Sequence, residues 1–409
     1  MKRIAARPKP ILVSLFRYAL QDHEAMANTY PHVLADLGRT VEVHHFCGKG
    51  QTRHWLADQA GVCVHELPVR FRRDCETDKW AKTLWWYFIS LRAAWWARRH
   101  KADLIYIEET LPWLPLLLAW VSGCPTAISA ADMFWDVYLP DHGIAGKLKR
   151  VLLRIDVWVW QRLRGLITHT QAFKEYAVRQ GLSDDRIFVV PEACEDTSFR
   201  RTDRYNARQS AGYHNNEQVI LHHGLLVPNK ALDRLLDFIA PLLHERPRLR
   251  IEFVGDGPMR NKLEAKAKIL HIQEQVRLLG WLPTVAQLNI LLNAADVSVV
   301  MRAGRVSDHF QVTANLLHSL ACGSPILAAR LKGVAELIHE GENGLLFNPA
   351  DGDEFRRQLV RLLDDEPLRR RLADAALITA RTRLNPRCIT SAWVAALRTL
   401  LTDFGKATQ

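Results

Sequence analysis

The sequence has few cysteines and no pair of them at metal-binding spacing. The seven cysteines among 409 residues are scattered, and none belongs to a Cys-x-x-Cys motif. A disulfide framework or a structural zinc site needs cysteines at regular, close spacing. The pattern therefore argues against both and favours reduced thiols in a cytosol.

Long hydrophobic runs are also missing. The longest apolar stretch, residues 111–123, is interrupted by prolines and is shorter than the roughly 20 residues that a transmembrane helix needs. The apolar run after the basic N-terminus is too short for a secretory signal peptide. We therefore expect a cytoplasmic protein that is soluble or peripherally bound to the inner face of the plasma membrane.

The sequence lacks any block of charge of one sign. The net charge is +11, but the excess is spread over both halves of the chain, and no helix-turn-helix, zinc-finger or RNA-binding signature accompanies it. We therefore expect no nucleic-acid partner, and nucleic-acid binding is the least favoured of the functions considered. An anionic small ligand or an anionic membrane surface suits a diffuse positive field equally well.

What the sequence does contain is a regular alternation of short apolar runs and helical patterns. Such a chain is too long for one core and predicts parallel sheets covered on both faces. In the first half the predicted strands are residues 11–15, 41–46, 62–69, 103–108, 126–131, 166–170 and 187–190. In the second half they are residues 219–223, 250–254, 276–279, 297–301, 325–329 and 345–347. The predicted fold class is α/β, with two Rossmann-like, doubly wound domains facing across a ligand cleft.

A polar segment without apolar periodicity, residues 195–218, separates the two patterns. We therefore place an N-terminal domain at residues 1–200 and a C-terminal domain at residues 201–385. Residues 386–409 predict a last helix, which we expect to cross back to the N-terminal domain.

Three turns of the second domain have chemistry that suits a phosphate. Gly224 follows a strand and Lys230 lies near the start of the next helix; Gly255 and Gly257 lie in the turn after the following strand. Glycine lets backbone amides approach an anion, and lysine supplies a mobile charge. Residues 313–325 offer a helix N-terminus, which attracts anions. Each feature alone is usually only a turn, but together they indicate a site for a phosphorylated ligand.

The order of these motifs resembles the GT-B glycosyltransferases, especially the nucleotide-sugar-using family 4 (group 1). The resemblance covers most of the chain, and its most specific part is "HSLACGSPILAARLKGVAELIHEGENGLLF", residues 318–347. It implies a glycosyltransferase that moves a sugar from a nucleotide-sugar donor to a glycan or lipid-linked acceptor, in bacterial surface polysaccharide or glycolipid assembly. We expect no cofactor and no obligatory metal.

The resemblance assigns roles to individual residues. Lys230 would meet the donor diphosphate, the backbone around residues 314–317 would cradle it, and the turn at Gly280 and Trp281 lies where the family holds the nucleotide base. The full donor set that it implies is Gly224, Lys230, Gly255, Gly257, Gly280, Trp281, Asn315, Leu316 and His318.

The resemblance also implies a carboxylate in the first domain. Asp132 ends a predicted strand, where it would serve as general base in an inverting enzyme or orient the acceptor hydroxyl in a retaining one. A helix-capping role is an equal alternative, and Asp136 is a weaker candidate for the same chemistry.

One departure from the family bears on the mechanism. The two glutamates of its Glu-x7-Glu motif fall on Phe310 and His318. His318 can still exchange hydrogen bonds with a ribose, or it can simply be packed within its helix. The loss leaves a non-catalytic GT-B partner of another transferase as an alternative. A nucleotide-sugar epimerase of the same fold is a further one, although its expected cluster of carboxylates and histidine is not evident.

Two patterns that suggest a metal have simpler interpretations. Asp351 and Asp353 form a D-x-D pair, but they open a helix, where acidic residues are expected as caps. His222 and His223 lie at a strand end without ligand partners at helical spacing. We therefore predict no metal site.

Tryptophan is concentrated near the N-terminus, with eleven of thirteen in the first 160 residues. In residues 79–101, helical spacing places Trp85, Phe88, Ile89, Arg92 and Trp96 on one side, as in a helix that contacts an anionic membrane. Packing on the first sheet is an equal alternative there. For the similar helix at residues 146–165, packing is favoured.

Overall fold

The computed structural model describes residues 9–16, 29–49, 54–67, 79–108, 113–130, 133, 135–136, 139, 142–194, 197–214 and 216–402. The chain divides into two compact units: unit 1 is Met1–Pro191 with Arg387–Gln409, and unit 2 is Glu192–Pro386. The predicted boundary lies at residue 200. Residues 192–200 belong to unit 2 because Cys194 N donates to Leu384 O at 2.9 Å and the Phe199 ring stacks on His318.

Unit 1 contains a fully parallel, seven-stranded sheet with the order β3-β2-β1-β4-β5-β6-β7. Its strands are β1 (Ile11–Phe16), β2 (Glu42–Gly48), β3 (Val62–Leu67), β4 (Leu104–Ile107), β5 (Thr126–Ser129), β6 (Gly165–Thr168) and β7 (Ile187–Val189). The central strands are buried along their whole length, which explains why they read as continuous apolar runs.

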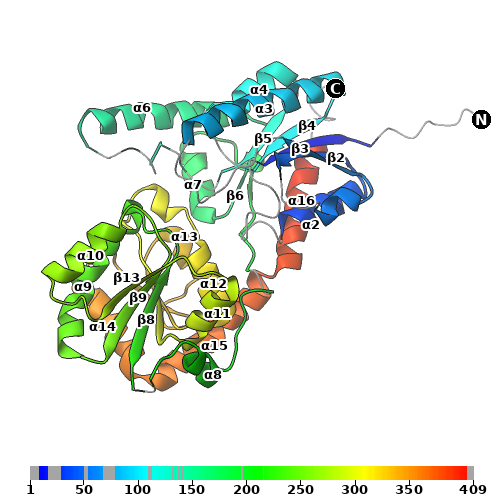
Figure 1. Ribbon diagram of the computed structural model, residues 1–409. Helices are drawn as coiled ribbons and strands as arrows, with labels where there is room; N and C mark the ends of the chain where they lie inside the picture. The colour runs from blue at the N-terminus through cyan, green and yellow to red at the C-terminus, as the bar shows by residue number, and fades with distance from the viewer. Residues whose placement is uncertain are drawn as a thin grey trace, which may run out of the picture. The chain divides into compact units, whose positions relative to one another are not determined.

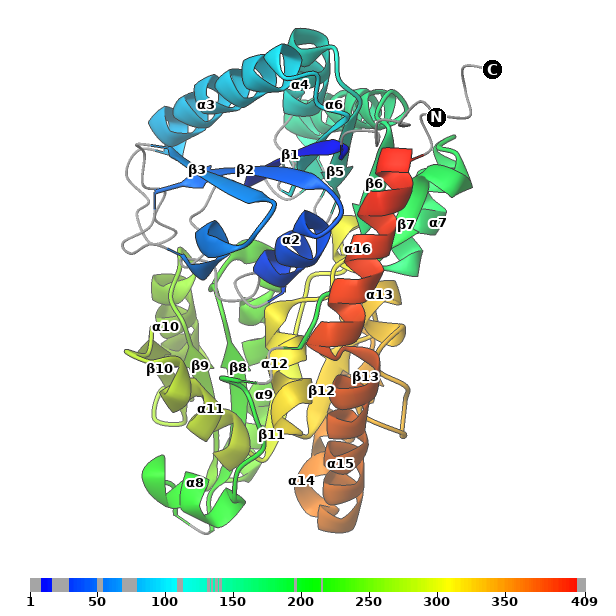
Figure 2. The same cartoon turned by 90° about the vertical axis from the view of Figure 1, so that its right-hand side faces the viewer.

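Right-handed crossovers place the helices of unit 1 on both faces of this sheet. The helices are α2 (Tyr30–Gly38), α3 (Lys79–Arg99), α4 (Leu114–Ser122), α6 (Gly143–Trp160), α7 (Gln171–Arg179) and α16 (Pro386–Thr402), with short helices η1 (Trp55–Asp58) and η2 (Asp184–Arg186). Figures 1 and 2 show α3, α4 and α6 on one face, and α2 and α16 on the other. Trp393 of α16 packs against Tyr30, Tyr106 and His169 of the same unit.

Of the side of α3 that spacing groups together, part packs on the sheet and part is exposed. Ile89 is buried, and Trp96 packs against His44 and Phe46 of β2. Phe88 of the same group is exposed, and so is Trp95, which the grouping did not include. Since α3 carries large apolar residues all round, spacing alone did not identify the side that packs on the sheet. The side chain of Trp85 lies outside the described residues.

Unit 2 has a parallel, six-stranded sheet with the order β10-β9-β8-β11-β12-β13. Its strands are β8 (Gln218–His223), β9 (Leu249–Val254), β10 (Val276–Gly280), β11 (Val297–Val300), β12 (Ile326–Ala329) and β13 (Leu345–Phe347). Its helices are α8 (Arg204–Ser210), α9 (Leu232–Glu245), α10 (Arg260–Ile269), α11 (Val285–Ala294), α12 (Ala314–Cys322), α13 (Lys332–Ala335), α14 (Gly352–Asp364) and α15 (Glu366–Arg383), with η3 (Pro228–Lys230) and η4 (Ser307–His309).

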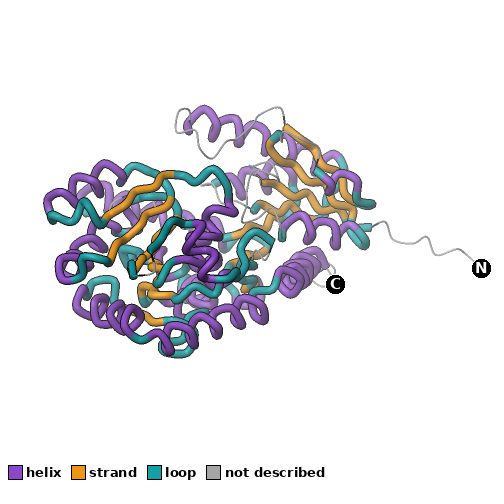
Figure 3. Tube along the Cα trace, turned by 60° about the horizontal axis from the view of Figure 1, so that its bottom comes forward, coloured by secondary structure: helices purple, strands orange, loops and turns teal. Residues whose placement is uncertain are grey.

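In each unit the strands lie between layers of helices (Figure 3). The prediction of two Rossmann-like parallel-sheet domains is therefore confirmed for both units. None of the helices in the described part of the chain has the length and hydropathy to span a bilayer.

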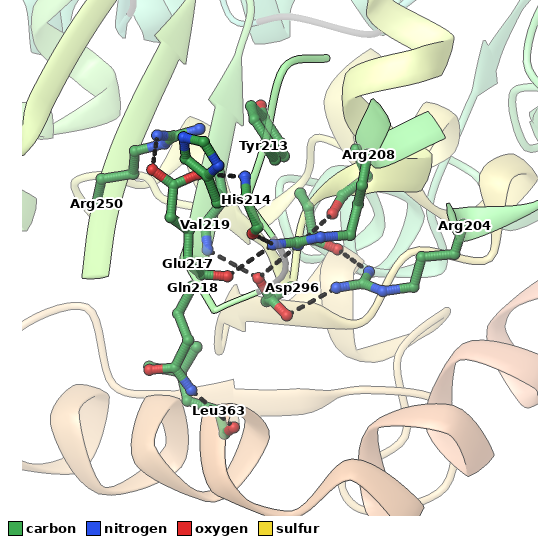
Figure 4. A network of polar contacts seen from close by, with 12 residues as sticks. Arg204, Arg208, Tyr213, His214, Glu217, Gln218, Val219, Arg250, Asp296 and Leu363 are labelled. Atoms are coloured by element: carbon green, nitrogen blue, oxygen red, sulfur yellow. Dashed lines mark hydrogen bonds and ion pairs between the residues drawn. The ribbon is translucent and has the colours of Figure 1, made fainter. Parts of the chain in front are cut away.

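A buried polar network joins α8 to the amino ends of the unit 2 strands (Figure 4). The Asp296 carboxylate accepts hydrogen bonds from Arg204 at 2.7 Å, Arg208 at 3.3 Å and the Val219 backbone N–H at 2.8 Å. Arg208 also donates to the carbonyls of His214 and Glu217. Removal of Asp296 would leave the buried Arg208 guanidinium and the partly exposed Arg204 guanidinium without their counter-charge.

We expect Asp296→Ala to lower the free energy of unfolding by about 3–5 kcal/mol, because it breaks a buried ion-pair network from one side. Denaturant titration followed by circular dichroism measures this change. Asp374→Ala is the matched control, since the Asp374 carboxylate pairs with Arg201 on the surface and such pairs contribute about 0–1 kcal/mol. Equal effects of the two substitutions would contradict the role given to Asp296.

Candidate functional site

In each sheet the strand order identifies one position, at the carboxyl ends of two neighbouring strands, as the place for a ligand. In an open parallel sheet, ligands bind outside the carboxyl ends of the strands, at the point where the order reverses. In unit 2 this point lies between β8 and β11, and in unit 1 between β1 and β4. The side chains at these two positions are therefore the first candidates for function.

At the unit 2 position, glycine backbones of neighbouring strand ends lie unusually close together. Gly224 N donates to Val254 O and Gly255 N donates to Gly280 O, both at 2.8 Å. Gly255 has φ +121°, and a Cβ there would lie 2.2 Å from Gly224 O. No side chain fits at such a distance, so Gly255 must be glycine for the turns after β8 and β9 to approach each other this closely.

Gly257 makes a second close backbone approach, to the loop that contains Leu226. A Cβ on Gly257 would lie 2.6 Å from Leu226 O. The loop is fixed there by Leu226 N donating to Asp256 O at 2.9 Å and by Met259 N donating to Leu226 O at 3.0 Å. The predicted residues Gly224, Gly255, Gly257 and Gly280 are therefore brought together by the fold.

Lys230 supplies positive charge beside these glycines. It ends η3 and is mostly buried, and its Nζ lies 2.8 Å from where a Cβ on Gly224 would stand. Burial and then the Lys230 charge lower the pKa of His222 to about 3. A buried ammonium group beside bare glycine backbone is well suited to meet an anion.

His318 lies in a stack of rings next to these residues. Its ring lies 3.7 Å from that of Phe199, with planes 12° apart, and its Nδ1 is 3.2 Å from His223 Nε2. Burial lowers the pKa of His318 to about 4, and burial together with His318 lowers the pKa of His223 further below its usual value. The pair is therefore neutral at physiological pH. The packed arrangement that the sequence allowed for His318 is present, and its contact with a ribose stays a prediction.

Helix α12 begins beside these residues, and its side chains point into the protein. Thr313 is the N-cap residue but makes no side-chain capping bond to the helix backbone. Asn315 and Leu316 are buried, and the N–H groups of Leu316 and Leu317 both donate to Thr313 O. At this helix end, the N–H groups of Ala314 and Asn315 are therefore the ones placed to meet an anion.

The loop after β11 contains a buried ion pair that sequence reasoning did not identify. Arg302 Nη1 lies 2.6 Å from Asp308 Oδ1, and Asp308 Oδ2 accepts from the N–H groups of Gly304 and Arg305. Ala303 N donates to Asn229 O at 2.9 Å, which ties this loop to the segment that carries Lys230. An arginine and an aspartate six residues apart in a loop give no recognisable signal without the strand order.

Two further donor-side positions differ in their surroundings. Trp281 follows β10 with its side chain 59% exposed, so its predicted contact with a nucleotide base stays a prediction. Phe310 is buried. The position of the first motif glutamate is thus occupied by a packed aromatic ring.

In unit 1, Asp132 lies outside the described residues. Asp136 is described, and its carboxylate is 2.6 Å from Lys149 Nζ in a buried ion pair. The Asp136 carboxylate is therefore engaged by Lys149, and its proposed contact with an acceptor stays a prediction.

A different carboxylate, Glu108, lies at the switch point of unit 1. It directly follows β4, its N–H donates to Leu15 O of β1 at 3.0 Å, and it is 7% exposed. Tyr106 Oη donates to Glu108 Oε2 at 2.5 Å. Burial and then the Glu108 charge raise the pKa of Tyr30 and of Tyr106 well above its usual value. Glu108 ends one of the predicted strands, so the strand order would have pointed to it.

The patterns that suggest a metal have the simpler explanation given above. Asp351 Oδ1 accepts from the N–H groups of Asp353 and Glu354, both at 2.9 Å, at the start of α14, which confirms the capping role. His222 Nδ1 lies 2.9 Å from Val299 O. Among the described residues, no group of three or more His, Cys, Asp or Glu side chains is arranged to hold a metal ion.

The chain is similar to known proteins over both units. The family described as "Glycosyl transferases group 1" matches residues 203–378, and the "Glycosyl transferase 4-like domain" matches residues 27–193. The lipopolysaccharide core biosynthesis glycosyltransferase LpsE of Rhizobium meliloti is 29% identical over 179 residues, which are 44% of this chain and 49% of the relative. A D-inositol 3-phosphate glycosyltransferase of Acidothermus cellulolyticus is 32% identical over 193 residues, 45% and 42% of the two chains.

In these alignments the chain spans about half the length of the curated relatives that it matches. Among solved structures, Anabaena HepE in complex with UDP and glucose has a TM-score of 0.71 at 18% identity, covering 95% of this chain and 100% of that one. The sucrose-phosphate synthase of Thermosynechococcus elongatus has a TM-score of 0.73 at 16% identity, covering 97% and 100%. These structural likenesses show the fold, and the two family matches together cover most of the chain. The protein therefore belongs to the group 1 glycosyltransferases of the GT-B fold.

Proposed function

We propose that the protein transfers a sugar from a nucleotide-sugar donor, bound by unit 2, to a glycan or lipid-linked acceptor, bound by unit 1. The observation that carries this proposal is the row of glycines at the carboxyl ends of β8, β9 and β10, next to the β8/β11 switch point, with the Lys230 ammonium group against Gly224. The UDP bound in the structurally similar Anabaena protein supports a nucleotide-sugar donor. The LpsE relative supports a role in surface polysaccharide or glycolipid assembly.

The proposed chemistry needs charge stabilisation on the leaving nucleoside diphosphate. Lys230 and the first N–H groups of α12 would meet the negative charge that develops there as the glycosidic bond breaks. We further propose that this fixed positive charge serves without an obligatory metal or cofactor. The contacts of Trp281 with the base and of His318 with the ribose belong to the same proposal.

Glu108 joins Asp132 as a candidate to orient or deprotonate the acceptor hydroxyl. A mostly buried carboxylate, held by the Tyr106 hydroxyl at the switch point, has the position and the chemistry for either task. We expect Glu108→Gln to lower the turnover number by about 10²–10⁴, the range for loss of a general base. Donor binding should stay unchanged, because it is assigned to unit 2.

Initial rates with a saturating nucleotide sugar measure the effect of Glu108→Gln, and calorimetric titration with the same donor provides the control. Tyr106→Phe removes only the hydroxyl and should give a smaller loss. Equal turnover of Glu108→Gln and wild type would remove Glu108 from the acceptor site.

A thermal-shift panel of UDP-, GDP- and ADP-sugars tests the proposed donor site. We expect at least one nucleotide sugar to raise the melting temperature of the wild-type protein and not that of Lys230→Met. Stabilisation by none of them would contradict the proposal. Stabilisation without any turnover would favour the non-catalytic partner that Phe310 and His318 suggest, and release of an epimerised sugar would favour the epimerase.

Peripheral contact with an anionic membrane through residues 79–101 is part of the same proposal. Phe88 and Trp95 of α3 are in solvent, and the Arg99 guanidinium lies 5.6 Å from the Trp95 ring centroid. An aromatic side chain with a cation beside it suits the headgroup region of a bilayer.

A further inference from the structure

Helix α6 presents an apolar stripe to solvent. Ile144 is 87% exposed, and Leu148, Val151 and Trp158 are each about half exposed. These residues follow one another at intervals of four, three and seven, so they lie along one side of the helix. A helix packed on a sheet normally turns its apolar stripe toward the core. The side of α6 that faces the protein buries Val159 and Trp160 together with Lys149 and Asp156, so the exposed residues form a second apolar stripe.

Positive charge borders this stripe. Lys147, Arg150 and Arg154 are exposed on α6, and the Arg162 guanidinium lies 3.6 Å above the ring of Trp158. The only acidic residue between positions 142 and 162 is Asp156, which is buried. The outward side of α6 is therefore apolar along its middle and cationic along its borders.

The neighbouring helices have the same character. Trp120 of α4 is 80% exposed, and α3 exposes Phe88 and Trp95. Neither α3 nor α4 contains an acidic residue. Arg98 of α3 donates to Val121 O of α4 at 3.1 Å, and all three helices lie on one face of the unit 1 sheet (Figures 1 and 2).

We propose that the outward side of α6, together with Trp120, is a docking surface for an anionic lipid bilayer. The aliphatic and tryptophan side chains would enter the headgroup and acyl boundary, while Lys147, Arg150 and Arg154 meet lipid phosphates. The principal lipid-binding element is then α6, rather than residues 79–101 alone. This inference concerns where the protein docks and does not require the proposed sugar transfer.

Charge decides between a bilayer and a second copy of the chain. Two copies joined through this surface would bring cations against cations, with no exposed acid on α3, α4 or α6 to pair with them, and such like-charge contacts are unfavourable. An anionic bilayer supplies the opposite charge and an apolar interior for the stripe. This surface is therefore better suited to an anionic bilayer than to the same surface of a second copy.

Vesicle flotation of the protein tests the proposal. We expect binding to phosphatidylcholine vesicles that contain phosphatidylglycerol, weak binding to phosphatidylcholine alone, and loss of binding as salt rises. Ile144→Gln with Leu148→Gln should lower the partition coefficient at least ~10-fold, because two exposed aliphatic side chains no longer enter the bilayer. Lys147→Gln with Arg154→Gln should lower it about 25-fold, at roughly fivefold for each cation near an anionic surface.

The matched control is Ile269→Gln with Ile378→Gln, two aliphatic side chains of unit 2 that are also well exposed. This control should bind vesicles as the wild type does. Circular dichroism melts check that all variants are folded, and their substitutions lie at exposed positions. The proposal would be overturned if the wild-type protein did not bind anionic vesicles. It would also be overturned if the stripe variant, Ile144→Gln with Leu148→Gln, bound them as well as the control does. Self-association that the stripe variant abolishes, without vesicle binding, would overturn it in favour of a second copy.

Discussion

Lys230→Met is expected to lower the turnover number with a nucleotide sugar by about 10²–10³, the range for loss of one group that stabilises transition-state charge. The Lys230 ammonium group is the cation placed against the bare backbone of Gly224, where it would meet the departing diphosphate. Methionine keeps an unbranched side chain of similar length and removes the charge. Initial rates of nucleoside diphosphate release measure the effect.

Two variants accompany Lys230→Met. Lys262→Met removes an exposed lysine of the same unit, whose Nζ is 2.8 Å from Asp233, and it should leave turnover unchanged. Lys230→Arg keeps the charge but changes its geometry, and an intermediate rate is expected because the two cations are not interchangeable at a tight site. A Lys230→Met enzyme that is folded and as active as the Lys262→Met control would refute the role assigned to Lys230.

Gly255→Ala is expected to damage both the fold and the donor site. The added Cβ would lie 2.2 Å from Gly224 O, and the backbone there has φ +121°, a conformation that costs a side-chain-bearing residue about 1–3 kcal/mol. The strand ends must move apart to admit the methyl group, which separates the backbone that the diphosphate would contact. We expect a fall in unfolding free energy of at least ~2 kcal/mol and a loss of donor affinity of at least ~10-fold.

Gly212→Ala separates backbone strain from the clash. Gly212 has φ +68°, with no atom within 4 Å of an added Cβ, so this variant carries the strain of the left-handed conformation alone, about 1 kcal/mol. Urea titrations compare the stabilities, and calorimetry with the donor compares the affinities. If Gly255→Ala binds the donor as well as Gly212→Ala, the row of glycines is not the donor site.

The sheets were predictable from sequence because buried parallel strands are short, apolar and regularly spaced. The runs at residues 103–108 and 297–301 correspond to β4 (Leu104–Ile107) and β11 (Val297–Val300). A local pattern of this kind needs no knowledge of long-range contacts.

The outward side of α3 was not predictable in the same way. Ile89 and Trp96 face the sheet, whereas Phe88 and Trp95 face solvent. Adjacent positions of similar hydrophobicity point in different directions, so only the register of the helix on the sheet decides between them. For residues 146–165 the sequence favoured packing on the sheet, and only the structure shows which side chains of α6 are exposed.

The candidate site was predictable where chemistry is local. Gly224, Gly255, Gly257 and Lys230 carry their signals in their own turns, and the fold brings them together. Residues that become candidates only through the strand order carry no local signal in the sequence. Glu108 and the Arg302–Asp308 pair became candidates only once β1 was seen beside β4 and β8 beside β11.

His318 lies where the family pattern has a glutamate. The sequence shows only that a histidine replaces a carboxylate. In the structure the His318 ring stacks on Phe199, its Nδ1 lies 3.2 Å from His223 Nε2, and burial lowers its pKa to about 4. A carboxylate at this position would lack the flat ring that Phe199 contacts, so the neighbouring residues fit the histidine.

The central claim is that unit 2 binds a nucleotide sugar and that the protein transfers its sugar. The most direct test is nucleoside diphosphate release from the donor that stabilises the wild-type protein, measured for wild type and for Lys230→Met at saturating donor. We expect steady turnover by the wild type and a loss of about 10²–10³ in the variant. Release by neither protein with any donor, or equal release by both, would contradict it.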